Sequence, residues 1–273
     1  VIICLLPKDD GGRRPIGLLP MAIRWWMRMR LDVVRTWQTQ HERPYFYAGK
    51  LKGATVAAWK QAACAELATT SDMFHYAAVL LDLVKCFERV PLDWLVRQGK
   101  RYSYPMAILR LCIAAYRIGR AIGVDGIFSA IILATRGIVA GSVTATTELR
   151  ALLIEFLDET VSIYKSTNLT VYVDDSGIES IGSMASVTRE VVGATRHLTN
   201  ALVEIGMEWS KTKNCCCASS KQLADSIVQA LRGLNVNNDQ RQKSLGGALG
   251  AGKVRNAKVA QRRLKAFRAR RQR

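Results

Sequence analysis

The sequence is poor in the residues that build metal sites from nitrogen and sulfur ligands. It has three scattered histidines in 273 residues, and its seven cysteines include no pair with CxxC spacing. A zinc site needs several such ligands close together, so these absences argue against one. An odd number of cysteines without a signal peptide indicates reduced thiols inside a cell. The run Cys215, Cys216, Cys217 is therefore expected in a buried strand, where cysteine behaves as a small hydrophobe.

Long uninterrupted apolar runs are also missing. The apolar start, VIICLL, is too short for the hydrophobic region of a signal peptide and lacks a basic segment before it. The most apolar later segment, 126–143, is interrupted by Arg136 and follows Asp125. Neither segment matches a membrane span, so we expect no membrane partner. Because the sequence does not begin with methionine, we expect a fragment of a longer chain.

Acidic residues are scarce. There are 22 of them against 40 Lys and Arg, which gives a net charge of +18 and favours a polyanion such as nucleic acid as partner. From Arg241 to Arg273 the sequence has 12 basic residues and no acidic one. This segment also carries apolar residues at helical spacing, namely Val254, Ala257, Ala260, Leu264 and Phe267. The pattern predicts a helix that docks through this stripe and presents its basic face to nucleic acid; a solvated basic tail or nuclear signal is the alternative.

Hydrophobic periodicity predicts an α+β fold. Helices are expected at 21–40, 53–70, 91–98, 105–119, 144–164 and 184–205. Strands are expected at 1–6, 16–19, 76–87 and 206–219, with a strand–turn–strand over 169–178 and a hairpin over 121–132 that turns at Asp125-Gly126. Residues 243–253 form a glycine-rich strand pair or a loop. Since helices and strands alternate without tandem βαβ units, a central antiparallel sheet packed on helices fits best.

Two adjacent carboxylates follow an apolar, β-branched run in LTVYVDDSGI. Leu169, Val171 and Val173 alternate with polar or aromatic residues, which is the period of a strand. The next four residues, 174–177, are typical of a turn. The pattern therefore predicts a hairpin with Asp174 and Asp175 at its tip. Taken alone, this is equally consistent with an ordinary solvated turn.

A third carboxylate, Asp82, lies inside the apolar run AAVLLDLVKCF. A buried carboxylate is costly unless it is paired or bound to a metal. Pairing with Lys85 or Arg89 would be a structural explanation. The functional explanation is a metal site shared with Asp174 and Asp175, holding two Mg²⁺ ions about 4 Å apart for phosphoryl transfer. Carboxylate oxygens are hard ligands that suit Mg²⁺.

Two segments, VLLDLVKCF and VYVDD, resemble the A and C motifs of reverse transcriptases. Asp82 is followed five positions later by an aromatic residue, and a YxDD box comes after it in the expected order. The resemblance is nearest to enzymes of non-LTR retrotransposons and group II introns. It implies a right-hand polymerase with fingers in 1–75, palm in 76–240, and the primer grip and basic start of a thumb in 241–273. It also implies an RNA template, a DNA primer, dNTPs, and two Mg²⁺ ions with Mn²⁺ as substitute. The cysteine count and the basic C-terminal segment favour an intracellular location, with the nucleus preferred.

The resemblance also implies roles for single residues. LLPKDDGGRRPIGLLP is similar to the fingers hairpin, in which Lys8 and Arg14 would contact the incoming triphosphate. Phe87 would exclude the 2′-hydroxyl of a ribonucleotide, and Tyr172 would lie beside the primer terminus. EIGMEWSKTKN is similar to the D motif, whose lysine would protonate pyrophosphate. Lys211 and Lys213 both fit, and Lys213 is favoured. KSLGGALG is similar to the primer-grip region.

The segment RGIVAGSVTATTEL departs from the family's B motif. Ala140 stands where the family usually has glutamine, and Ala145-Thr146 replace Ser-Pro. Gly141 remains, so the backbone can still approach a nucleotide closely. Loss of the amide predicts a weaker contact of position 140 with the nucleotide. These changes motivate one alternative, an inactive relative that only binds nucleic acid. A second alternative is an RNA-templated RNA polymerase, which shares the palm but which Phe87 disfavours.

Overall fold

The computed structural model describes the chain except residues 9–10, 50, 71–72, 246, 252–256 and 272–273. The described residues form two compact units. The first unit contains 1–42, 84–155 and 204–208, and the second contains 43–83, 156–203 and 209–273. Each is described separately below. The division into fingers, palm and thumb segments stays a prediction.

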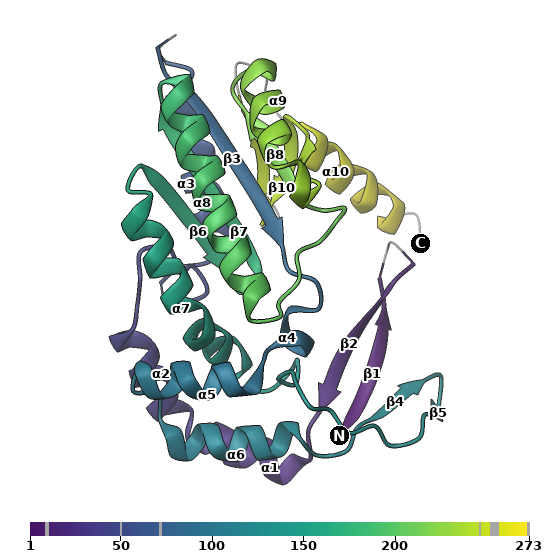
Figure 1. Ribbon diagram of the computed structural model, residues 1–273. Coiled ribbons are helices and arrows are strands. Elements are labelled where there is room, and N and C mark those ends of the chain that lie inside the picture. The colour runs from purple at the N-terminus through teal and green to yellow at the C-terminus, as the bar shows by residue number, and fades with distance from the viewer. Residues whose placement is uncertain (9–10, 50, 71–72, 246, 252–256, 272–273) are drawn as a thin grey trace. The chain divides into compact units, whose positions relative to one another are not determined.

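The first unit contains a four-stranded sheet in the order β2-β1-β4-β5 (Figure 1). β1 (Ile2–Pro7) and β2 (Arg13–Leu18) form an antiparallel hairpin, and β4 (Ala121–Val124) runs parallel to β1. β4 and β5 (Ile127–Phe128) are joined by Asp125 and Gly126, both at positive φ. The predicted hairpin with its Asp-Gly turn is therefore confirmed.

Helices of the first unit pack around a buried core. They are α1 (Met21–Met29), α2 (Leu31–Gln40), α4 (Cys86–Arg89), α5 (Leu92–Arg101), α6 (Met106–Tyr116) and the beginning of α7 (Ala145–Ile163). The single helix expected over 21–40 is divided at Arg30, whose ψ of 5° leaves the helical range. α2 is anchored by Trp37, whose indole donates a hydrogen bond to the carbonyl of Tyr102 at 2.7 Å.

The second unit is built on a five-stranded sheet in the order β6-β7-β3-β8-β9. The strands are β6 (Thr167–Tyr172), β7 (Asp175–Gly182), β3 (His75–Asp82), β8 (Cys215–Ala218) and β9 (Asn237–Asn238). All neighbours are antiparallel except β8 and β9. The predicted central antiparallel sheet is therefore confirmed.

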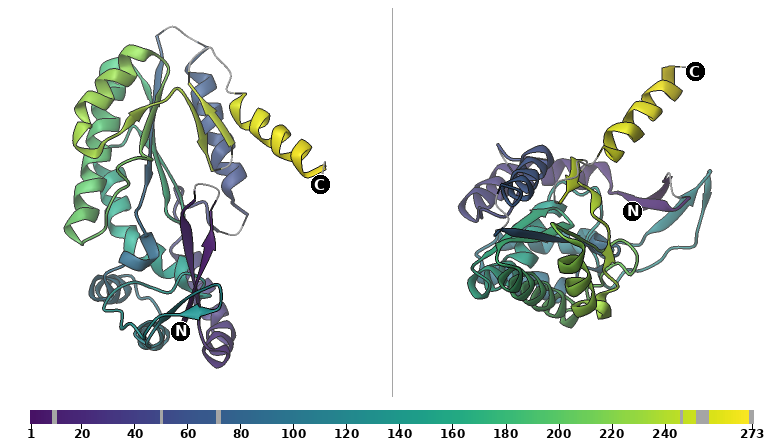
Figure 2. Two further views of the ribbon diagram at one scale, coloured as in Figure 1. Left: turned by 90° about the vertical axis from the view of Figure 1, so that its right-hand side faces the viewer. Right: turned by 90° about the horizontal axis from the view of Figure 1, so that it is seen from above.

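Helices cover both faces of this sheet. Figure 2 shows α8 (Met184–Glu204) and α9 (Lys221–Ala230) on one face. The other face carries α3 (Ala54–Leu67) and the antiparallel hairpin of β10 (Arg241–Ser244) and β11 (Gly247–Gly250). A 3₁₀ turn, Arg232–Leu234, follows α9.

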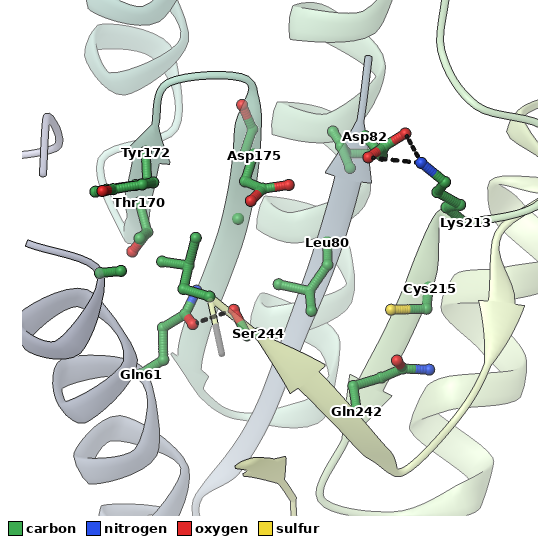
Figure 3. A pocket seen from close by; sticks show the side chains of 15 residues that line it. Gln61, Leu80, Asp82, Thr170, Tyr172, Asp175, Lys213, Cys215, Gln242 and Ser244 are labelled. Atoms are coloured by element: carbon green, nitrogen blue, oxygen red, sulfur yellow. Dashed lines mark hydrogen bonds and ion pairs between the residues drawn. The ribbon is translucent and has the colours of Figure 1, made fainter. Parts of the chain in front are cut away.

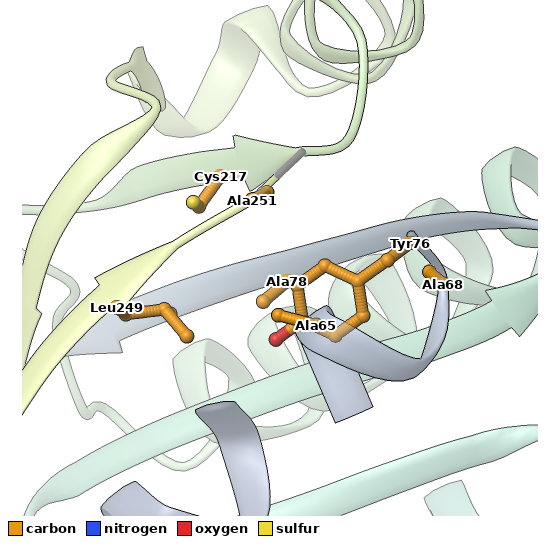
Figure 4. Close-up of a cluster of buried hydrophobic side chains, with 7 residues drawn as sticks. All are labelled: Ala65, Ala68, Tyr76, Ala78, Cys217, Leu249 and Ala251. Carbon is orange, nitrogen blue, oxygen red and sulfur yellow. The ribbon is translucent and has the colours of Figure 1, made fainter. Parts of the chain in front are cut away.

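Small side chains bring α3 and β11 close to the sheet. A buried cluster joins Ala65, Ala68, Tyr76, Ala78, Cys217, Leu249 and Ala251 (Figure 4). Five of these seven side chains are alanine or cysteine, so the layers can approach more closely than bulkier residues would allow. The expectation that the cysteine run forms a buried strand is confirmed, because all three cysteines lie in β8 and are buried.

Two expectations about strand bounds and one about burial are wrong. The strand expected over 76–87 ends at Asp82, because Lys85 at φ +48° begins the short helix α4. The strand expected over 206–219 covers only Cys215–Ala218. The basic segment does form a helix, α10 (Lys258–Arg271), but its predicted apolar stripe is not buried: Leu264 and Phe267 are 49% and 61% exposed. Val254 lies outside the described residues.

Among the described helices, no stretch combines the length and the apolarity that a membrane crossing requires.

Candidate active site

Two neighbouring strands of the second unit place a carboxylate at the same edge of the sheet. Asp82 is the last residue of β3 and Asp175 is the first residue of β7, and the two are direct partners in the antiparallel register. The strands bring together side chains that are more than ninety positions apart in the sequence. Asp174 precedes Asp175 in the turn between β6 and β7. The three predicted catalytic carboxylates thus belong to one local group.

The turn between β6 and β7 is tight and strained. Only Val173 and Asp174 connect the paired residues Tyr172 and Asp175. Val173 has φ +62°, a conformation that β-branched residues rarely adopt. The expected turn over 174–177 is therefore displaced toward the N-terminus, and Asp175 belongs to the strand. A strained backbone conformation persists only where the surrounding structure enforces it, and such conformations cluster at functional sites.

The backbone of Asp82 is held by a buried amide that the sequence did not reveal. The N–H of Asp82 donates to Oδ1 of Asn214 at 3.1 Å, and its carbonyl accepts from the N–H of Ser210 at 2.8 Å. Nδ2 of Asn214 donates to the carbonyl of Ser210 at 2.6 Å, which closes the arrangement. Asn214 is fully buried. Its only signal in the sequence is its position directly before the cysteine strand.

Lys213 forms an ion pair with the carboxylate of Asp82. Oγ of Ser210 accepts from the N–H of Lys213 at 3.2 Å, and Nζ of Lys213 lies 3.1 and 3.3 Å from the two carboxylate oxygens of Asp82. Neither Lys85 nor Arg89 is the partner of Asp82 in the described contacts, and Arg89 pairs with Glu208. That sequence alternative is therefore wrong.

Desolvation and neighbouring negative charge both disfavour the ionised form of Asp175. Desolvation raises the pKa of Asp175 to about 6, and the charges of Asp174 and Asp82 act in the same direction. The ammonium group of Lys213 opposes this increase. Asp175 lines a cavity and is an exposed residue, so solvent moderates the effect of desolvation on its carboxyl group.

The donor atoms of this site fit a hard divalent cation. Three carboxylates contribute only oxygen, the ligand type that Mg²⁺ and Mn²⁺ prefer. In the described residues, however, no three His, Cys, Asp or Glu side chains converge as a ready metal cage. The ion pair with Lys213 engages both oxygens of Asp82. The site therefore has oxygen ligands suitable for Mg²⁺. In this side-chain arrangement, however, the positive charge next to Asp82 comes from Lys213.

A cavity of about 440 Å³ opens beside the carboxylates (Figure 3). Asp82, Tyr172, Asp175 and Lys213 line one part of it. Further lining residues come from α3, β6, β8 and β10, including Gln61, Thr170, Cys215, Gln242 and Ser244. Oγ1 of Thr170 is buried and makes no hydrogen bond within the described part of the chain. The cavity is thus polar at the carboxylate edge, and its lining includes Thr170, a residue with a buried hydroxyl that has no hydrogen-bond partner among the described residues.

The remaining predicted site residues belong to the first unit. Lys8 and Arg14 are exposed residues of the β1–β2 hairpin, whose turn is closed by a hydrogen bond from the N–H of Lys8 to the carbonyl of Gly12 at 2.8 Å. Arg14 pairs with Leu6 in the register. Both side chains are therefore accessible to an anion from the solvent.

The glycine-bearing segment 135–143 packs on this hairpin and on α4. The carbonyl of Ala140 accepts from the N–H of Gly17 at 2.8 Å, and Ile138 donates to the carbonyl of Phe87 at 2.8 Å. Gly141 has φ +105°, and a Cβ there would approach the carbonyl oxygen of Gly17 to 3.0 Å. The segment thus contacts both α4, which carries Phe87, and β2, which carries Arg14.

Comparison with known proteins agrees with this arrangement. The sequence profile of the family described as reverse transcriptase (RNA-dependent DNA polymerase) matches residues 6–246. No curated protein matches the chain.

Solved telomerase structures share the fold at low sequence identity. A telomerase from Candida albicans in complex with the TWJ fragment of telomeric RNA superposes with a TM-score of 0.63 at 12% identity, over 94% of this chain and 45% of that one. The apo telomerase of Candida tropicalis gives 0.58 at 11% identity, over 94% and 48%. A form of it truncated from the C-terminal domain gives 0.52 at 13%, over 79% and 49%. The chain spans less than half the length of these structures.

Proposed function

Because this chain belongs to the reverse transcriptase (RNA-dependent DNA polymerase) family, we propose that it is the catalytic core of an enzyme that copies an RNA template into DNA. The reaction would join a dNTP to the 3′-hydroxyl of a DNA primer and release pyrophosphate. One observation carries the proposal: Asp82 and Asp175 face each other at one sheet edge, with Asp174 and Lys213 beside them.

The carboxylates of Asp82, Asp174 and Asp175 would hold two Mg²⁺ ions, for which Mn²⁺ can substitute. When bound, such ions lower the pKa of an attacking hydroxyl and neutralise charge on the leaving group. The chain supplies the negative charge that recruits them. Desolvation raises the pKa of Asp175, and the charges of Asp174 and Asp82 raise it further, so a cation bound here would favour the ionised carboxylate.

Lys213 is the proposed general acid. Its Nζ already lies at the carboxylate edge, on a segment fixed by Ser210. A proton given to the departing pyrophosphate would come from this ammonium group. Lys211, the alternative from the sequence, makes none of the described contacts with these carboxylates.

The first unit would bind the nucleotide. Lys8 and Arg14 would contact the triphosphate, and Phe87 would exclude a 2′-hydroxyl. Gly141 allows close approach of the backbone, whereas Ala140 offers no side-chain amide. In the second unit, Tyr172 would lie beside the primer terminus at the cavity. These roles follow the family resemblance residue by residue.

We assign the chain to a retroelement protein that acts in the nucleus. The reduced cysteines and the basic segment 241–273 motivate this placement. The same basic residues would contact template–primer phosphates, so binding should weaken steeply with salt. A fluorescent fusion excluded from the nucleus would contradict the location without affecting the enzymatic proposal.

A second candidate function is nucleic-acid binding without synthesis. Ala140 and the pair Ala145-Thr146 favour it, because they remove family contacts to the nucleotide. The intact carboxylate group disfavours it.

Primer extension separates the two functions. We expect incorporation of dTTP on poly(rA)/oligo(dT) with Mg²⁺ or Mn²⁺, and none by Asp174→Asn. A folded preparation that binds this duplex yet incorporates nothing supports the second function. Equal extension by Asp174→Asn and the parent protein would refute the metal assignment.

A further inference from the structure

Gln61 occupies an unusual place in the second unit. It lies on α3, a helix whose other buried positions are Ala57 and Ala65. Its side chain is only 1% exposed. Burial of an amide costs free energy unless hydrogen bonds compensate for lost water. An apolar residue would fill this position at lower cost, so the contacts of the amide indicate what it does.

One end of the Gln61 side chain holds the β10–β11 hairpin. Oγ of Ser244, the last residue of β10, donates to Oε1 of Gln61 at 2.7 Å in a buried hydrogen bond. The two residues are 183 positions apart in the sequence. Figure 3 shows this bond inside the cavity that the carboxylates border.

The other end of the same side chain lies against the strand that carries Asp175. A Cβ at Gly177 would come within 2.7 Å of Nε2 of Gln61. Gly177 lies two residues after Asp175 on β7, so both residues face the same side of the sheet. The amide therefore spans the space between the hairpin and the catalytic strand.

A second close approach fixes the hairpin on α3. A Cβ at Gly247, the first residue of β11, would come within 2.8 Å of Cβ of Ala58. Ala58 and Gln61 are three residues apart and share one face of the helix. Backbone contact at Gly247 and the hydrogen bond at Ser244 together determine where the hairpin lies.

We propose that Gln61 is a positioning residue that sets the β10–β11 hairpin at a fixed distance from the strand of Asp175. The inference rests on the proposed function for one point, that this hairpin contacts the primer. A primer seated on the hairpin would then have its terminus aligned with the carboxylates. Gln61 acts through the hairpin and the strand, and it does not itself touch the reacting atoms.

Ser244→Ala removes the hydrogen bond and leaves Gln61 in place. Ser244→Thr keeps a hydroxyl and should behave as the parent protein does. Ser180→Ala is the matched control, since it removes another buried hydroxyl of the same unit, which donates to the carbonyl of Ser166 at 2.9 Å. Gly177→Ala perturbs the contact between β7 and the Gln61 side chain, because the added Cβ would come within 2.7 Å of Nε2.

Two measurements need no catalysis. In Ser244→Ala and Gly177→Ala, amide hydrogen exchange in β10 and β11 should accelerate about 2- to 10-fold, the range expected for one lost hydrogen bond. The Kd for a fluorescently labelled RNA–DNA primer–template duplex, measured by anisotropy without dNTP, should rise by a similar factor. Ser180→Ala should change neither beyond its effect on the melting temperature.

Primer-extension assays then measure how the loss of the Ser244–Gln61 hydrogen bond affects primer use. The KM for primer–template should rise in Ser244→Ala and return toward the parent value in Ser244→Thr. Exchange in the hairpin equal to that of Ser180→Ala would overturn the inference. Faster exchange with unchanged duplex affinity would also overturn it, because Gln61 would then be merely structural. A parent protein that binds the duplex but does not extend it refutes the proposed function, while the exchange and affinity results still decide this inference.

Discussion

Nζ of Lys213 lies 3.1 and 3.3 Å from the two carboxylate oxygens of Asp82. The lysine therefore occupies the electrostatic role that a bound cation would take at the same carboxylate. Competition between the ammonium group and a divalent ion follows from this geometry. Lys213 is 58% exposed, so its side chain can leave when an ion arrives.

Lys213→Ala should have opposite effects on metal binding and on catalysis. Mn²⁺ affinity, measured by electron paramagnetic resonance titration without primer, should tighten about 2- to 5-fold, since an exposed ion pair contributes up to about 1 kcal/mol. The rate of extension should fall about 100-fold if Lys213 is the general acid. Lys211→Ala is the control, because it removes one positive charge from the same segment. If both variants gain metal affinity equally, the competition does not occur.

Asp175→Asn should stabilise the metal-free protein at neutral pH. The pKa of Asp175 is raised to about 6 from its ordinary value of 3.8, so the folded state binds the proton more tightly than the unfolded state. Stability contributed by this group is therefore present below about pH 4 and is lost as pH rises through 6. With EDTA present, the melting temperature of Asp175→Asn should exceed that of the parent protein at pH 7.5.

The difference between Asp175→Asn and the parent protein should disappear near pH 4. Asp125→Asn, which changes an exposed carboxylate in the β4–β5 turn, is the matched control. A stabilisation by Asp175→Asn that is the same at both pH values would show that the ionisation of Asp175 is not its cause.

The carboxylate pair was predictable because strand period and composition marked both segments. Leu169 and Val171 alternate as the strand β6 requires, although Val173 lies in the turn, and Asp82 interrupts an apolar run. The exact register was not predictable, since it depends on Val173 adopting a positive φ that its own preferences oppose. The β4–β5 hairpin was easier to predict, because the dipeptide Asp125-Gly126 itself favours a two-residue hairpin turn.

The roles of residues that act through long-range contacts could not be predicted from the sequence. Asn214 and Gln61 are polar residues in unremarkable positions, and each acquires its role from partners more than 100 residues away. α9 was missed although Ser220 accepts a hydrogen bond from the N–H of Leu223, a helix-capping pattern visible in the sequence. The apolar stripe of α10 shows the reverse error: helical spacing predicted the helix, but spacing alone does not say that Leu264 and Phe267 are covered.

Phe87→Ala should admit ribonucleotides. Phe87 is half-buried in α4, and its backbone carbonyl, which a substitution leaves intact, anchors Ile138. Removal of the ring should reduce discrimination between dNTP and rNTP, measured as the ratio of kcat/KM values, by at least about 10-fold because a steric clash is lost. Phe128→Ala, which truncates an exposed phenylalanine on β5, should leave the ratio as it is. Unchanged discrimination in Phe87→Ala would remove Phe87 from this role.

Ala140→Gln should improve the use of dNTPs. The backbone of Ala140 is fixed by its carbonyl, which accepts from Gly17 at 2.8 Å, and a longer side chain does not remove that bond. Glutamine would restore the amide that the family resemblance places against the incoming nucleotide. One added hydrogen bond should raise kcat/KM for dTTP about 2- to 10-fold, mainly through a lower KM. Ala130→Gln adds the same amide at an exposed position of the first unit and should have no effect. If Ala140→Gln leaves KM unchanged while the protein remains active, the segment 135–143 contacts the nucleotide through its backbone alone, and the substitution at position 140 does not limit the enzyme.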